Sequence, residues 1–168
     1  AALGDPTLRP NGWAGEHWSP AIGAEALACR DAAAIFDETS FSKLELSGTG
    51  AAHFLNRIAA NEMDRPIGSV TYTQLCNARG GIECDLTATR LDADRYLLVT
   101  GTAFGNHDRG WVRKQQEILG VGDVSVNDVT AAYACFGVWG PLARPILEAV
   151  SDDALGNDAF PYLTARRI

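Results

Sequence analysis

Polar and apolar side chains alternate between Ser69 and Leu91, and this alternation predicts two strands joined by a tight turn. Neighbouring side chains of a strand point to opposite faces, so every second residue shares a face. The shared faces are Val70, Tyr72, Gln74 and Cys76 on the first strand, and Glu83, Asp85, Thr87 and Thr89 on the second. The segment 77–81 contains Asn and Gly, which accept a positive φ. The predicted hairpin can therefore bring a phenol and a carboxylate towards one site.

Helical spacing of apolar residues, and short apolar runs, predict the other elements. We expect helices at 22–36, from 51 to 58, around Trp111–Leu119 and after Gly140, with Pro141 at the first helical position. Strands are expected at 41–47, 95–100, 121–129, 131–139 and from 162 onwards. Their irregular order around a central hairpin predicts an α+β fold, with a mixed or mostly antiparallel sheet and packed helices. Residues 1–20, which contain three prolines, Trp13 and Trp18, are expected to form an extended N-terminal arm before a single domain at 21–168.

Composition excludes several classes of function. Fourteen Lys and Arg against 21 Asp and Glu give a net charge of −7. The sequence lacks the basic stripe that tracks phosphates, so we expect no nucleic-acid partner. No apolar stretch approaches the roughly 18 residues that span a bilayer, and the first residues lack the pattern of a signal peptide. We expect no membrane partner and a cytoplasmic location, or the mitochondrial matrix in a eukaryote.

The four cysteines show neither a CxxC pattern nor a histidine at metal-binding spacing, so we expect buried reduced thiols and no metal site. His107 and Asp108 could form an acid–base pair, but adjacent residues at a helix start rarely face each other, and capping is the expected role. Gly48 and Gly50 lie between a strand and a helix, as in a dinucleotide-binding turn. The third glycine of that motif is replaced by His53, so a simple helix-entry turn is favoured over a nucleotide-binding oxidoreductase.

Asp85 is the remaining candidate, because strands are depleted in Asp. The pattern alone leaves open whether it lies on a solvated polar face or beside Tyr72 in a ligand site. In the second case burial would raise its pKa above about 3.9 and make it a better proton acceptor.

Five groups of residues occur in an order that resembles a known family. They are Arg30 in the first helix, Ile35-Phe36-Asp37 with Ser40-Phe41, Tyr72-Thr73 with Asn77, Gly80-Gly81-Ile82 with Asp85-Leu86, and Gly140-Pro141 with Ala143-Arg144. The chain resembles the folate-binding aminomethyltransferase family of the glycine-cleavage T-protein. Within it, Ser40-Phe41-Ser-Lys43, Val99-Thr100-Gly101 and Phe136-Gly-x-Trp139 are most similar to the folate domains of dimethylglycine and sarcosine dehydrogenases.

The resemblance implies a fold, a cofactor and a reaction. The chain would be the N-terminal portion of a tetrahydrofolate-binding domain, incomplete at its C-terminus, that captures a methylene unit from a methylamine donor as 5,10-methylenetetrahydrofolate. Asp85 would be the catalytic proton acceptor, and the cavity would be lined by Tyr72, Phe41, Thr87 and Gly101. FAD would belong to a flavin-dependent dehydrogenase domain or subunit not present here. Glycine-cleavage enzymes have an acid at Cys84 and an Asn at Gly101, so these departures fit the dehydrogenase branch.

One alternative keeps the fold and changes the activity. Relatives that handle folate in iron–sulfur maintenance are non-catalytic binding or assembly modules, and the resemblance allows that role too. They carry a Lys-Gly-Cys-x-Gly-Gln-Glu motif, which these 168 residues lack. The alternative predicts folate binding without one-carbon transfer.

Overall fold

The computed structural model describes residues 19–168, so most of the predicted N-terminal arm lies outside the described residues. The described chain forms two compact units. The larger contains Glu38–Cys135 and Gly156–Arg167, and the smaller contains residues 19–37, Phe136–Leu155 and Ile168. The predicted domain boundary at residue 21 stays a prediction.

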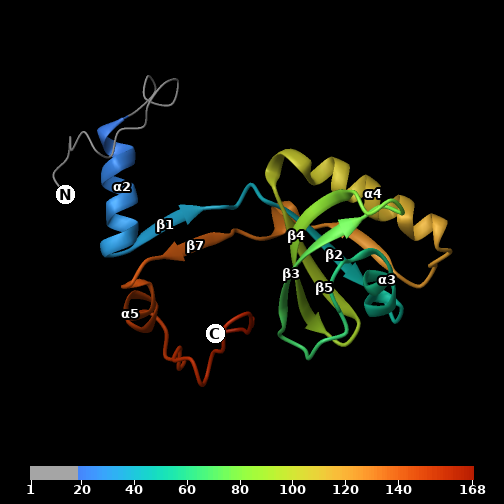
Figure 1. Cartoon of the computed structure of the whole chain (residues 1–168). Coiled ribbons are helices and arrows are strands. Elements are labelled where there is room, and N and C mark those ends of the chain that lie inside the picture. Colours follow the sequence, from blue (N-terminus) through green and yellow to red (C-terminus); the bar gives the residue numbers. More distant parts are fainter. Residues whose placement is uncertain (1–18) are drawn as a thin grey trace. The chain divides into compact units, whose positions relative to one another are not determined.

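A five-stranded sheet in the order β3-β4-β5-β2-β6 forms the larger unit (Figure 1). The strands are β2 (Ser42–Ser47), β3 (Val70–Cys76), β4 (Ile82–Asp92), β5 (Arg95–Thr100) and β6 (Ser125–Asp128). Every neighbouring pair is antiparallel. The helices are α3 (Ala51–Ile58) and α4 (Gly105–Ile118), with short 3-10 turns at Thr102–Phe104 and Thr130–Ala132. The predicted α+β class and the predicted hairpin are both confirmed.

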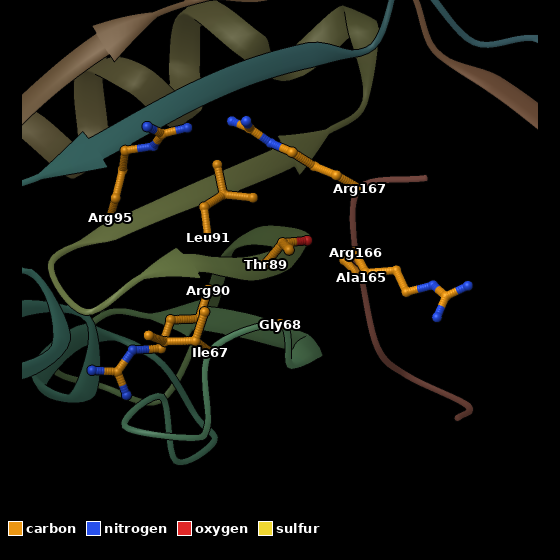
Figure 2. Close-up of a pocket in the computed structure, with 9 residues that line it drawn as sticks. All are labelled: Ile67, Gly68, Thr89, Arg90, Leu91, Arg95, Ala165, Arg166 and Arg167. Carbon is orange, nitrogen blue, oxygen red and sulfur yellow. The ribbon is translucent and has the colours of Figure 1, made fainter. Parts of the chain in front are cut away.

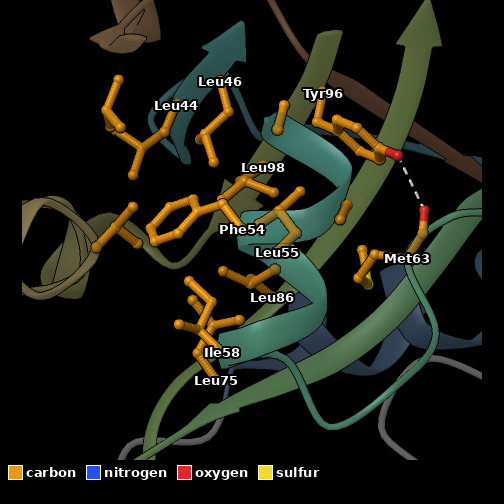
Figure 3. Close-up of a cluster of buried hydrophobic side chains, with 14 of the residues drawn as sticks. Leu44, Leu46, Phe54, Leu55, Ile58, Met63, Leu75, Leu86, Tyr96 and Leu98 are labelled. Carbon is orange, nitrogen blue, oxygen red and sulfur yellow. Dashed lines mark hydrogen bonds between the residues drawn. The ribbon is translucent and has the colours of Figure 1, made fainter. Parts of the chain in front are cut away.

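One face of this sheet forms the hydrophobic core (Figure 3). Phe54, Leu55 and Ile58 of α3 pack against alternate strand residues such as Leu46 and Leu98, all of them buried. The phenol of Tyr96 donates a 3.0 Å hydrogen bond to the Met63 carbonyl. This bond satisfies a buried polar group. The i, i+3, i+4, i+7 spacing in α3 therefore correctly predicted the buried helix face.

The opposite face of the sheet is open at the hairpin. Tyr72 is 57% exposed, Asp85 is exposed, and Thr87 and Gln74 are half-buried, whereas the intervening Thr73, Leu86 and Ala88 are buried. This alternation follows from the pleat of a strand with one core face. The face that carries the predicted site is thus the one that α3 and α4 do not cover.

The smaller unit pairs β1 (Ala34–Asp37) with β7 (Phe136–Trp139) in an antiparallel ladder. It also contains α2 (Pro20–Asp31) and α5 (Ala143–Glu148). The Ser19 hydroxyl accepts a hydrogen bond from the Ala21 backbone and caps α2. Gly140 has φ 106°, and a Cβ there would lie 2.5 Å from two carbonyl oxygens at the end of α2. Only glycine fits this corner, because it has no Cβ and accepts a positive φ.

Several predicted boundaries are wrong. The first helix ends at Asp31, and residues 34–37 are a strand, because β1 finds a partner in the distant segment β7 that local periodicity does not reveal. The strand predicted at 131–139 is confined to β7, and α5 begins at Ala143 rather than at Pro141. The strand predicted from 162 onwards is a single bridge between Thr164 and Ser69.

Candidate functional site

The side chain of Asn77 organises the turn of the β3–β4 hairpin. Its Oδ1 accepts hydrogen bonds from the backbone N–H groups of Arg79 (2.9 Å) and Gly81 (3.0 Å). Its Nδ2 donates to Glu83 Oε1 at 2.7 Å. Gly80 adopts φ 77°, a conformation that an L-residue rarely accepts. These contacts fix the start of β4, just before Asp85.

The hairpin brings Tyr72 and Asp85 together, as the alternation predicted. Tyr72 pairs with Thr87 and Gln74 pairs with Asp85, so the phenol and the carboxylate are diagonal neighbours on one face. A hydrogen bond with the Asp85 carboxylate, followed by partial desolvation, raises the pKa of the Tyr72 phenol above its ordinary value. A carboxylate held beside an aromatic ring can accept protons from a flat, nitrogen-rich ligand.

The other predicted site residues lie at the same end of the sheet as Asp85. Thr87 lies two positions from Asp85 and shares its face. Across the sheet, Thr100 of β5 pairs with Ser42 of β2 on one side and with Leu86 of β4 on the other. Three of the predicted residues, Phe41, Gly101 and Asp85, are the neighbours of these three paired residues at the same end of the sheet. Gly101 has φ −61°, and a Cβ there would make only an ordinary contact of 3.5 Å with the Phe104 ring, so the backbone at this position does not require glycine.

Asp85 is exposed in this structure, so the burial expected around a catalytic carboxylate is not met by these residues alone. The site is one surface of a sheet rather than an enclosed cavity. Ligand sites bury most of their ligand, so this surface needs a second wall.

The Gly48–Gly50 turn has a structural explanation. Gly48 has φ 139°, and a Cβ there would clash with the Asp123 carbonyl oxygen. A Cβ on Gly50 would approach the Asp123 carboxylate at 2.6 Å, and Thr49 Oγ1 donates to that carboxylate at 2.9 Å. An acidic group therefore occupies the start of α3, where a dinucleotide would place its phosphates.

His107 and Asp108 face each other, and the sequence argument that they would not is wrong. His107 Nδ1 lies 2.9 Å from Asp108 Oδ1. Asp108 is buried and accepts a 2.5 Å hydrogen bond from Thr100 Oγ1. Desolvation, then the nearby Asp108 carboxylate, raises the pKa of the buried Cys84 thiol. The spacing of cysteines and histidines in the sequence does not predict this cluster, because α4 and β4 come together only when the chain is folded.

A pocket of about 400 Å³ lies at the other end of the open face (Figure 2). Arg95 and Arg167 point to the same side of it across Leu91, whereas Arg166 points away and lies over the Phe160 ring. Arg90 is held by Asp64. The pocket was not predicted, because its arginines come from segments that lie far apart in the sequence.

Among the described residues, no helix is both long and apolar enough to cross a membrane.

The architecture is that of an aminomethyltransferase. The chain superposes on the glycine-cleavage aminomethyltransferase T of Bartonella henselae with a TM-score of 0.68 and 26% identity, covering 75% of this chain and 34% of that protein. Residues 6–168 match the family model described as the GCVT N-terminal domain. The chain belongs to this family.

Curated relatives include enzymes with a dehydrogenase or oxidase activity. Human mitochondrial sarcosine dehydrogenase is 34% identical over 163 residues, covering 85% of this chain. The 4-methylaminobutanoate oxidase of Paenarthrobacter nicotinovorans is 31% identical and covers 95%. The chain spans 17% and 18% of the lengths of these two relatives. The predicted family and its dehydrogenase branch are thus confirmed as similarities.

Proposed function

We propose that this chain forms part of a domain for tetrahydrofolate-dependent one-carbon transfer. The domain would capture a methylene unit from a methylamine donor of the dimethylglycine or sarcosine type and produce 5,10-methylenetetrahydrofolate. The single observation that carries this proposal is the diagonal placement of Asp85 and Tyr72 on one exposed face of the sheet. Membership of the aminomethyltransferase family and the similarity to sarcosine dehydrogenases support it.

The residues present fit the cofactor. Tetrahydrofolate, when bound, supplies the ring and bridge nitrogens that take up the one-carbon unit. The Asp85 carboxylate would accept hydrogen bonds from the N–H groups of tetrahydrofolate and accept the proton that the amine releases. Tyr72 lies diagonally beside Asp85 on the same face, and its ring would offer an apolar surface to the pterin. Phe41, Thr87 and Gly101 would line the same edge.

The donor and the flavin chemistry belong to other parts of the proposed enzyme. We propose that these residues form the first half of the folate domain, and that a flavin-dependent dehydrogenase domain or subunit delivers the one-carbon unit. The similarity to sarcosine dehydrogenases and to the sarcosine oxidase alpha subunit of Rhizobium meliloti supports this arrangement. The alternative, a non-catalytic folate-binding module of the same fold, would keep the binding face and dispense with Asp85 as a proton acceptor.

Replacement of Asp85 by Asn separates these two functions. In the full-length protein that contains these residues, Asp85→Asn should lower the rate of 5,10-methylenetetrahydrofolate formation by about 10²-fold or more, the usual contribution of a general base. Asp94→Asn, which removes an exposed carboxylate in the turn after β4, should leave the rate unchanged. A wild-type rate in Asp85→Asn would remove the assigned role and favour the binding module.

A further inference from the structure

Three metal-binding side chains meet where the start of α4 lies against β4. The Cys84 sulfur, one ring nitrogen of His107 and one oxygen of Asp108 all lie within 4.8 Å of one another. Cys84 and Asp108 are buried, at 2% and 1% exposure, while His107 reaches solvent. Cys84 points to the core side of β4, opposite to Asp85, so this cluster is separate from the folate face.

The donor set suits a zinc-like cation. Zinc binds thiolate at about 2.3 Å and imidazole or carboxylate at about 2.0–2.2 Å, so tetrahedral ligands are separated by roughly 3.3–3.8 Å. Metal binding would draw the three ligand atoms, which now lie within 4.8 Å of one another, into that range. Three protein ligands leave a fourth position, on the side where His107 is exposed, for water or another small ligand. Magnesium and calcium prefer all-oxygen sites and are disfavoured by the cysteine.

The surrounding groups hold the ligands in place, as in natural zinc sites. The second ring nitrogen of His107 lies 3.8 Å from Glu83 Oε2, and Asn77 fixes Glu83 through a 2.7 Å hydrogen bond. A carboxylate against the outer nitrogen of a ligating histidine sets its tautomer and orientation. The Thr100 hydroxyl holds the other oxygen of Asp108.

We propose that Cys84, His107 and Asp108 bind one divalent cation of the zinc class. On binding, the Cys84 S–H bond breaks, its proton leaves to solvent, and the sulfur bonds to the metal without change of oxidation state. The ion would join β4 to the start of α4. This proposal does not depend on the folate function.

Cobalt(II) titration of the chain tests the site, because a cobalt–thiolate bond gives a charge-transfer absorption in the near ultraviolet. The wild-type chain, reduced and stripped of metal, should show this band and saturate at one cobalt per chain, and zinc should displace it. Cys84→Ser should abolish the band. The matched control Cys76→Ser, in the neighbouring strand, should retain it.

Exposed histidines provide a test that does not threaten folding. His107→Gln should weaken cobalt affinity about 10- to 100-fold, whereas His53→Gln, on the exposed side of α3, should have no effect. Glu83→Gln should weaken binding by about tenfold or more through the histidine. Absence of the band in the wild-type chain, or an undiminished band in Cys84→Ser, would overturn the proposal, as would equal affinities of His107→Gln and His53→Gln.

Discussion

At position 72 a tyrosinate is disfavoured, because it would lose the hydrogen bond to Asp85 and face the negative charge of that carboxylate. The pKa of Tyr72 is therefore raised, and the neutral phenol is favoured in the folded chain. This contribution to stability is fully present below the unfolded tyrosine pKa of about 10 and is lost as the pH rises through the folded value.

Tyrosine ¹³C NMR can measure this pairing directly, with the Tyr72 signal assigned from Tyr72→Phe. We expect Asp85→Asn to lower the pKa of Tyr72 towards its ordinary value, because the amide carries no charge. Asp94→Asn serves as the control, since it removes the same charge beyond the far end of β4 and should leave the Tyr72 titration in place. An identical Tyr72 titration in wild type and Asp85→Asn would show that the two groups do not interact.

At the level of single residues, the sequence predicted neighbours on one strand face better than neighbours between elements. Period-two alternation placed Tyr72 and Asp85 together, because pairing within a hairpin is local. The contact between His107 and Asp108 was missed, because adjacent residues of a helix usually point in different directions. Cys84 joins the same pair from β4, an earlier and separate element, beyond the reach of any spacing rule.

At the level of elements, the turn that links β2 to α3 depends on glycine at position 48. Its φ of 139° is unfavourable for alanine, and an added Cβ would collide with the Asp123 carbonyl. Gly48→Ala should therefore destabilise the chain by about 1–3 kcal/mol, the usual cost of a strained backbone conformation. Gly110→Ala is the matched control, since Gly110 lies within α4 with nothing near the added Cβ. It should stabilise the chain by about 0.5–1 kcal/mol.

Urea unfolding of the two alanine variants measures both effects, and opposite shifts of the midpoint are the expected result. Equal midpoints for Gly48→Ala and wild type would mean that the turn relaxes away from Asp123. The same turn shows why a sequence motif alone does not identify a phosphate site. A glycine pair between strand and helix predicted the location of the bend correctly, but only the position of Asp123 distinguishes close packing from a phosphate site.

At the level of the whole molecule, a region was predicted well where its contacts join residues that are close in the sequence. The sheet of the larger unit and its buried helix face were predicted, because hairpins and an amphipathic helix carry their signals in adjacent residues. The smaller unit was predicted less well. Ala34–Asp37 becomes a strand only through β7, and Ile35, Phe36 and Trp139 remain exposed, so neither helical nor strand burial patterns apply.

The open sheet face also limits what these 168 residues can bind alone. Ligand sites bury about 70–90% of the ligand surface, whereas Tyr72 is 57% exposed and Asp85 faces solvent. We therefore expect calorimetric titration of the isolated chain with tetrahydrofolate to give a dissociation constant weaker than about 1 µM, or about −8.2 kcal/mol. The Tyr72 NMR titration on the same sample confirms that the hairpin is formed. A dissociation constant of about 1 µM or below that is lost in Tyr72→Ala would show that this single face suffices, and that no second wall is required.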